Sequence, residues 1–147
     1  MGQQQLLLVI LVTILVGIAT VVALNVFGDS AQSANRDAVR QDLLGGAATA
    51  QGFYIRPEIM GGGENSFVGI ELNDLNIPGV RNLDDDPEEG DTPNDENQNG
   101  KYSIELSDAT TLTIRGIPSG STDDYIELTL VRDGSVWNST FANQTDD

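Results

Sequence analysis

An uninterrupted apolar segment, Leu6–Leu24, lies near the start of the chain and contains nineteen residues without a charged side chain. In an α-helix these residues span roughly 28 Å at about 1.5 Å per residue, close to the hydrocarbon thickness of a bilayer. The rest of the chain is polar and acidic. This contrast limits the possible folds, because a helix that is apolar on every side needs cover from lipid, from a protein core or from copies of itself.

Four interpretations of the apolar segment compete: a cleaved secretory signal, a permanent membrane anchor, a buried core helix, and a helix that bundles with its own copies. A secretory signal has a basic lead and an apolar stretch of about 7 to 15 residues. Here Met1–Gln5 contains no Lys or Arg, and the apolar segment is longer. A core helix is disfavoured because a small acidic domain has too little apolar surface to enclose it. We therefore expect lipid or other copies to cover the segment.

Residues 25–51 are expected to continue the helix with an amphipathic pattern. They contain no proline, and small or apolar residues recur at helical spacing. The charged residues Arg36, Asp37, Arg40 and Asp42 fall largely on the other, solvated side. The expected packing face consists of Val26, Ala31, Ala34, Ala38, Leu43 or Leu44, and Ala47. Gly28 allows a kink or break, and Gly45–Gly46 is a second weak point because each glycine costs roughly 1 kcal/mol relative to alanine. The pattern predicts one long helix whose second half lies against a globular head.

The sequence after Gln51 predicts a small β-rich head over residues 52–147. Residues 52–63 are expected to form an irregular connector or a flexible loop because they include a proline and three consecutive glycines, and 67–72 fit a strand or a short helix. Apolar residues alternate with polar ones at Tyr102, Ile104, Leu106, Leu112, Ile114, Ile126, Leu128 and Leu130. Asp133–Gly134 predicts a hairpin with a type I′ turn. We predict an α+β fold in which an antiparallel meander of three to four strands packs on the helix of residues 1–51.

The first fifty residues resemble the type IV pilin family, the subunits of bacterial and archaeal surface filaments. The resemblance consists of the polar start Gly2–Gln5, the run beginning Leu6–Ile10, the mid-run Gly17 and the amphipathic extension. In that family a membrane-embedded precursor is trimmed beside a glycine, and the subunits then bundle their N-terminal helices in a filament core. The resemblance implies a major pilin whose assembly helix includes Gln5, Leu6, Leu7, Ile10, Ile14 and Gly17.

The resemblance also implies partners and a location. The partners are copies of the chain in a helical homopolymer and, before polymerisation, the inner membrane and the pilus assembly machinery; the filament lies at the cell surface. Pilins usually carry a glutamate at the fifth mature position, which pairs with the neighbouring subunit's terminal amine. Gln5 occupies this place if Met1 is the mature start, whereas Leu7 occupies it if cleavage follows Gly2. Because the lead lacks basic residues, we expect the numbering to describe a mature or trimmed chain.

An acidic stretch, residues 83–100, has eight acidic residues among the thirteen from Asp84 to Glu96. A solvated loop is the simplest expectation for such a block of like charge. The residues Asp95, Asn97 and Asn99, followed by Gly100, also match the opening of a calcium loop. Position twelve of that pattern is Leu106, so Asp84, Asp86 or Asp91 would have to complete the coordination. The acidic loop and the Ca²⁺ site stay open as alternatives.

Two N-glycosylation sequons begin at Asn138 and Asn143, although a tail rich in Asn and Thr also produces such matches by chance. Nearby Trp137 and Phe141 are expected in the strand core. The absence of cysteine excludes disulfides, and the absence of histidine excludes the usual serine triad. A formal net charge of −16 disfavours nucleic-acid binding, which needs a cationic surface.

Two functional hypotheses follow from the sequence. One is a structural filament subunit without enzyme activity or a required cofactor, because the carboxylates crowd a loop rather than an apolar pocket that would separate their pKa values. The other is a membrane-anchored extracytoplasmic module that binds calcium, sugar or a protein partner. A minor pilin that starts or tips a filament lies between the two.

Overall fold

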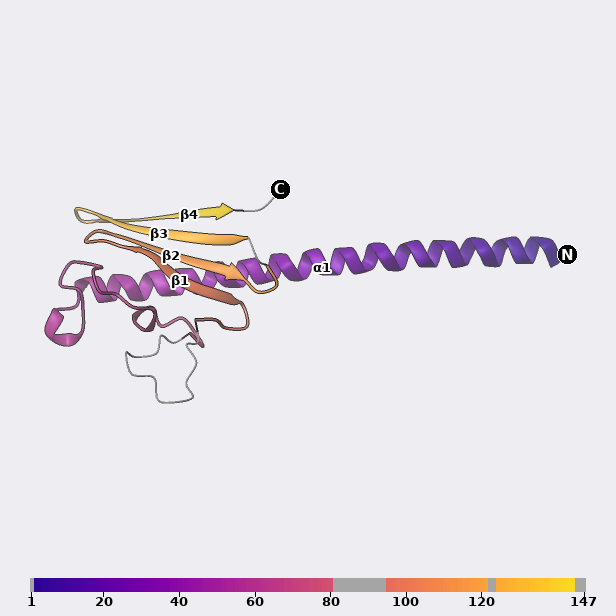
Figure 1. The fold of residues 1–147 in the computed structure, drawn as a ribbon. Coiled ribbons are helices and arrows are strands. Elements are labelled where there is room, and N and C mark those ends of the chain that lie inside the picture. Colours follow the sequence, from indigo (N-terminus) through magenta and orange to yellow (C-terminus); the bar gives the residue numbers. More distant parts are fainter. Residues whose placement is uncertain (1, 81–94, 122–123, 145–147) are drawn as a thin grey trace, which may run out of the picture. The chain divides into compact units, whose positions relative to one another are not determined.

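The computed structural model describes residues 2–80, 95–121 and 124–144 (Figure 1). The described residues form the helix α1 (Gly2–Ile55), the short 3₁₀ helices η1 (Glu58–Met60) and η2 (Leu72–Leu75), and the strands β1 (Gly100–Ser107), β2 (Thr111–Pro118), β3 (Tyr125–Asp133) and β4 (Val136–Gln144). The chain divides into two compact units, Met1–Ala34 and Asn35–Asp147. The predicted α+β fold, with a long helix followed by a small antiparallel sheet, is confirmed.

The first unit is helical from Gly2 onward, and its apolar side chains are exposed. Two hydroxyls interrupt the apolar segment, and both are satisfied within the helix. Thr13 Oγ1 donates to the carbonyl of Val9 at 2.7 Å, and Thr20 Oγ1 donates to that of Val16 at 2.8 Å. Such bonding to the preceding turn lets a hydroxyl lie in an apolar environment without an unpaired donor.

The helix α1 is continuous through both glycine positions at which the sequence allowed a break, Gly28 and Gly45–Gly46. At Gly46 the helix is supported by packing, because this residue is buried beside Ile77. A Cβ built on Gly46 would lie 3.4 Å from Ile77 Cγ1. A small residue at this point therefore lets the loop before the sheet approach the helix.

The second unit contains a four-stranded antiparallel sheet in the order β1-β2-β3-β4, which confirms the predicted meander (Figure 1). One face of the sheet packs on residues 35–55 of α1. The predicted inward residues of β2 and β3 are buried there: Leu112, Ile114, Ile126, Leu128 and Leu130. Alternation with a period of two produces this result, because one buried face fixes the register of each strand.

The first strand departs from the predicted alternation. Ile104 pairs with Ile114, but Leu106 pairs with Thr113, so the register shifts by one residue at Glu105. Such a bulge turns the following side chains to the other face of the sheet. Leu106 consequently lies on the outer face and is 49% exposed, and its predicted place in the core was wrong.

The buried face of α1 differs in part from the predicted one. Leu43 and Ala47 are buried as expected, whereas Leu44 is 50% exposed. Val26, Ala31 and Ala34 belong to the first unit and are exposed. The observed face consists of Val39, Leu43, Gly46, Ala47, Ala50, Phe53 and Tyr54. Ala38 is only half-buried because Val39, one residue later, faces the sheet.

The helix approaches the sheet closely at Gly116 of β2. A Cβ built on Gly116 would lie 2.5 Å from Val39 Cγ1 and 3.5 Å from Leu43 Cδ1. A glycine within a strand often marks such a close approach of another element. Gly116 was not identified as special from the sequence, because only the three-dimensional packing places Val39 above it.

The connector between helix and sheet is more ordered than expected. Residues 52–55 continue α1, and the turn at Glu58–Met60 is a 3₁₀ helix. The second 3₁₀ helix begins with a capping box in which Glu71 and Asp74 each bind the other's backbone N–H. Residues 67–71 form neither a strand nor a helix, so both alternatives predicted for residues 67–72 were wrong, and the 3₁₀ helix η2 begins only at Leu72.

The predicted β3–β4 hairpin is present, but its turn lies one residue later. Asp133 pairs with Val136, which leaves Gly134 and Ser135 as the central residues. Only Gly134 has a positive φ, of 57°. The type I′ turn centred on Asp133–Gly134 was therefore wrong, and glycine at the first central position is typical of type II′.

Aromatic side chains close the core beside this hairpin. The ring centroids of Trp137 and Tyr54 lie 5.1 Å apart, and those of Tyr54 and Phe67 lie 4.9 Å apart. Trp137 thus packs against the core as predicted. Phe141 is 38% exposed because β4 is an edge strand, so its predicted burial is only partial.

We expect Gly116→Ala to lower the free energy of unfolding of the second unit by about 1–3 kcal/mol, because the new methyl overlaps Val39. Gly45→Ala is the matched control, since nothing lies within 4 Å of its Cβ and alanine favours helix. Urea unfolding of the full chain in detergent, followed by Trp137 fluorescence, measures both. Equal stability of the Gly116→Ala variant and the wild type would contradict the close contact.

Candidate functional site

Most of the exposed large hydrophobic side chains among the described residues lie in the apolar segment. An 18-residue window of α1 near the N-terminus is long and apolar enough to cross a membrane, and none of it is buried within the described chain. The predicted assembly residues all lie on this exposed helix: Gln5, Leu6, Leu7, Ile10, Ile14 and Gly17. Spacings of three and four residues place Ile10, Ile14 and Gly17 on one face.

The apolar segment has no polar face. Its residues that are not fully apolar are Thr13, Gly17 and Thr20, and both hydroxyls bond to the helix itself. A helix that lies flat in a membrane interface needs a strongly polar side. The segment is therefore suited to complete enclosure, either by lipid or by other apolar helices.

A polar cluster fastens the second half of α1 to the head. Asp42 Oδ2 accepts hydrogen bonds from Asn97 Nδ2 at 3.1 Å, Asn99 Nδ2 at 2.8 Å and Tyr102 Oη at 2.6 Å. Asn97 Nδ2 also donates to the carbonyl of Pro78 at 2.9 Å. One half-buried carboxylate thus joins the helix, the loop before the acidic stretch and the start of β1. The sequence had placed Asp42 on the solvated face of the helix.

Two of the predicted calcium ligands belong to this cluster. Asn97 Oδ1 accepts the backbone N–H of Asn99 at 2.8 Å and that of Gly100 at 3.1 Å. Asp95 Oδ2 lies 3.1 Å from Lys101 Nζ. Bound Ca²⁺ would compete with these contacts for the same oxygens.

The rest of the calcium site is not tested by the structure. Asp84, Asp86 and Asp91 lie outside the described residues. Within residues 2–80, 95–121 and 124–144, no group of three or more His, Cys, Asp or Glu is arranged to hold a metal ion. Calcium binding by Asp95, Asn97 and Asn99 therefore stays a prediction.

A second set of contacts fixes the beginning of the head to α1. Asn35 Nδ2 donates to the carbonyl of Ser119 at 2.8 Å, and Arg36 pairs with Asp124. Both α1 residues lie at the start of the second unit. Together with the Asp42 cluster, they hold the helix to the sheet from two places along its length.

The outer face of the sheet carries an ion-pair cluster centred on Arg115. Its guanidinium binds Glu127 at 2.6 Å, approaches Glu105 at 3.2 Å and lies 4.4 Å from the ring centroid of Tyr125. The hydrogen bond to Glu127 raises the pKa of Arg115. Arg115 is thus neutralised by its own sheet rather than presented to an anionic ligand.

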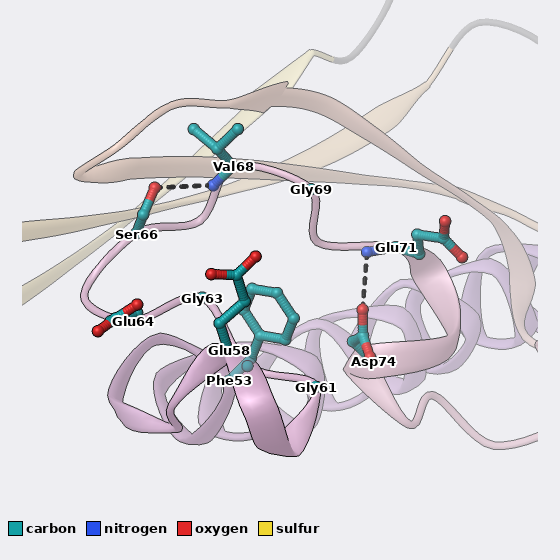
Figure 2. Close-up of a pocket in the computed structure, with 11 residues that line it drawn as sticks. Phe53, Glu58, Gly61, Gly63, Glu64, Ser66, Val68, Gly69, Glu71 and Asp74 are labelled. Carbon is teal, nitrogen blue, oxygen red and sulfur yellow. Dashed lines mark hydrogen bonds between the residues drawn. The ribbon is translucent and has the colours of Figure 1, made fainter.

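An open depression lies beside the C-terminal end of α1 (Figure 2). The residues that line it are Phe53, Glu58, Gly61, Gly62, Gly63, Glu64, Ser66, Val68, Gly69, Glu71 and Asp74. Ser66 Oγ accepts the N–H of Val68 at 3.1 Å, and Asp74 Oδ2 accepts that of Glu71 at 3.0 Å (Figure 2). These polar side chains accept hydrogen bonds from backbone groups of the connector itself. The depression is therefore a consequence of how the connector folds.

Both sequon asparagines lie on the edge strand β4 and are exposed. Asn138 is opposite Val131 and Asn143 is opposite Ile126. Because they are five positions apart on one strand, they lie on opposite faces of the sheet. Either side chain is accessible to a modifying enzyme in the folded head, and glycosylation stays a prediction.

Comparisons with known proteins give no assignment: no protein-family model, curated protein or solved structure matches this chain. The resemblance of the first fifty residues to pilins therefore stays a prediction.

Asp42→Ala is expected to lower the free energy of unfolding by about 1–3 kcal/mol, because Asn99 Nδ2 and Tyr102 Oη lose this acceptor and Asn97 Nδ2 keeps only the carbonyl of Pro78. Asp37→Ala is the matched control, since that carboxylate lies on the same helix in an exposed pair with Arg40 and such pairs contribute roughly 0–1 kcal/mol. Urea unfolding curves compare the two. A similar loss in both variants would show that the cluster contributes little.

From the Asp42 cluster we also predict that the folded chain loses stability at alkaline pH. Burial, and next the hydrogen bond to Asp42, raise the pKa of Tyr102 well above its usual range. Tyr102 stays protonated in the folded chain while it ionises in the unfolded chain above pH of about 10, so stability present at neutral pH falls as the pH rises past that value. For the Tyr102→Phe variant we expect the free energy of unfolding to fall less steeply as the pH rises. Unfolding measured across alkaline pH tests this, and parallel curves for both proteins would contradict it.

Proposed function

We propose that this chain is the major structural subunit of an extracellular, type IV pilus-like filament, which assembles when the apolar segments of many copies bundle together. The observation that carries the proposal is the complete exposure of an 18-residue apolar window within the described chain. The described residues bury none of this window, so in water the segment requires other molecules for cover.

The energetics favour association between copies. Moving one large apolar side chain out of water contributes about 1.5–3 kcal/mol, and most residues of Leu6–Leu24 are of this kind. Only part of this sum survives the loss of translational and rotational freedom on association. The remaining part is still large enough to make dissociation into water extremely slow.

The attachment of the head supports a filament subunit over a simple anchor. A single-span anchor needs only the apolar segment, whereas here the same helix continues to Ile55 and becomes part of the head's core. The Asp42 cluster and the Arg36–Asp124 pair reinforce this attachment. A repeated contact between helices, if it does not close into a ring, generates a helical polymer with the heads joined directly to it.

The second candidate is a membrane-anchored extracytoplasmic binding module. The observation that favours it is the length of the apolar helix, which is sufficient to cross a bilayer. A precursor that waits in the membrane before polymerisation would have the same property. A minor pilin, present at few copies per filament, would combine both roles.

Imaging of surface material sheared from cells distinguishes these candidates. We expect long fibres whose main protein is this chain, identified by mass spectrometry, because the apolar segment is then buried without lipid. Cells that lack the chain are the control. Recovery of the protein only from membranes, as a monomer that needs detergent to stay in solution, would instead support the anchored module. The same spectra would report the mature N-terminus, its methylation and any glycans.

A further inference from the structure

The connector after α1 displays two large apolar side chains to solvent. Ile59 is 93% exposed and Met60 is 68% exposed, and both lie in η1. We call this pair the apolar knob. Ile59 is the most exposed large hydrophobic residue of the described chain, and Met60 lies next to it. Two such adjacent side chains in a short ordered turn indicate an interaction surface.

The turn that carries the knob is closed by its own backbone. The N–H groups of Met60 and Gly62 donate to the carbonyl of Pro57 at 2.9 and 3.2 Å, and the N–H of Gly61 donates to that of Glu58 at 2.9 Å. Three further bonds tie residues 63–65 to the carbonyls of Phe53, Arg56 and Tyr54 at the end of α1. The knob is thus fixed in place before any partner arrives.

Two glycines in this turn have no space for a side chain. A Cβ on Gly62 would lie 2.2 Å from the carbonyl oxygen of Arg56, and one on Gly63 would lie 1.8 Å from that of Ser66. The chain therefore folds back tightly just after Met60. A tight, well-bonded turn reduces the conformational entropy that the knob loses on binding.

We propose that the apolar knob packs on the apolar segment of a neighbouring copy, and this inference rests on the proposed filament. Charge selects this partner. Each copy has a formal net charge of −16, so head surfaces repel one another, whereas Leu6–Leu24 carries no charge. Glu58 and Glu64 lie close to the knob in the sequence, and their negative charge also disfavours docking on an anionic bilayer surface.

Photo-crosslinking from position 59 of the full chain tests the contact in sheared filaments. A benzophenone side chain in place of Ile59 should form dimers whose crosslinked peptide includes residues 6–24 of a second copy. The same group in place of Leu106, which is exposed on the outer face of the sheet, is the control and should not reach that segment. Crosslinks from position 59 to another head, or to lipid, would overturn the inference.

A paired variant measures what the knob contributes. The double variant Ile59→Ser with Met60→Ser should lower filament yield at least about tenfold, because assembly no longer moves two large apolar side chains out of water. Leu106→Ser should leave the yield unchanged. Because all three residues are exposed, urea unfolding in detergent should be the same for each variant, which separates assembly from folding. Wild-type filaments with an unaffected double variant would refute the knob alone, whereas absence of wild-type filaments would refute the proposed function and the knob together.

Discussion

One helix, α1, carries two apolar surfaces that differ in how they are covered, and the rest of the structure depends on this difference. Along residues 39–54 a single face is buried in the core, and the absence of a side chain at Gly116 lets Val39 lie directly against β2. Along Leu6–Leu24 every face is apolar and none is covered by the described chain. The first surface can be satisfied within one molecule, because a sheet needs only one apolar stripe. The second cannot, because a helix apolar all round must be enclosed on all sides.

The head is held to α1 by polar contacts as well as by apolar packing. Asp42 of α1 accepts hydrogen bonds from Asn97, Asn99 and Tyr102, which lie far from the helix in the sequence. Apolar packing alone tolerates sliding of a helix along a sheet, whereas hydrogen bonds of 2.6–3.1 Å fix one position. A half-buried carboxylate without its partners destabilises the fold. The cluster therefore stabilises the one register of helix, loop and strand in which these partners are present. Attachment in a single register matters for any polymer in which each helix must carry its head in the same way.

The sequence predicted those elements whose pattern is local and periodic. The long helix, the alternation of Leu112 and Ile114, and the hairpin near Gly134 follow from spacing alone. The bulge at Glu105 and the turn at Gly134–Ser135 were missed because each shifts the register by one residue, which is decided by cross-strand packing. Spacing also left Leu43 and Leu44 equivalent, and only the position of the sheet buries the first. Asp42 and Gly116 had no sequence signal, since their roles depend on partners about sixty or more residues away.

The negative charge of the chain restricts how copies can associate. At a formal charge of −16, heads that approach one another repel, although salt at physiological strength screens exposed charges beyond about 8 Å. Two unit charges 4 Å apart in water cost only about 1 kcal/mol, which is less than the gain of about 1.5–3 kcal/mol from burying one large apolar side chain. Contacts that place uncharged surface against uncharged surface avoid most of this repulsion and keep most of the gain. In the described chain the extended surface of that kind is Leu6–Leu24, so association through this segment can proceed while the acidic heads stay solvated and apart.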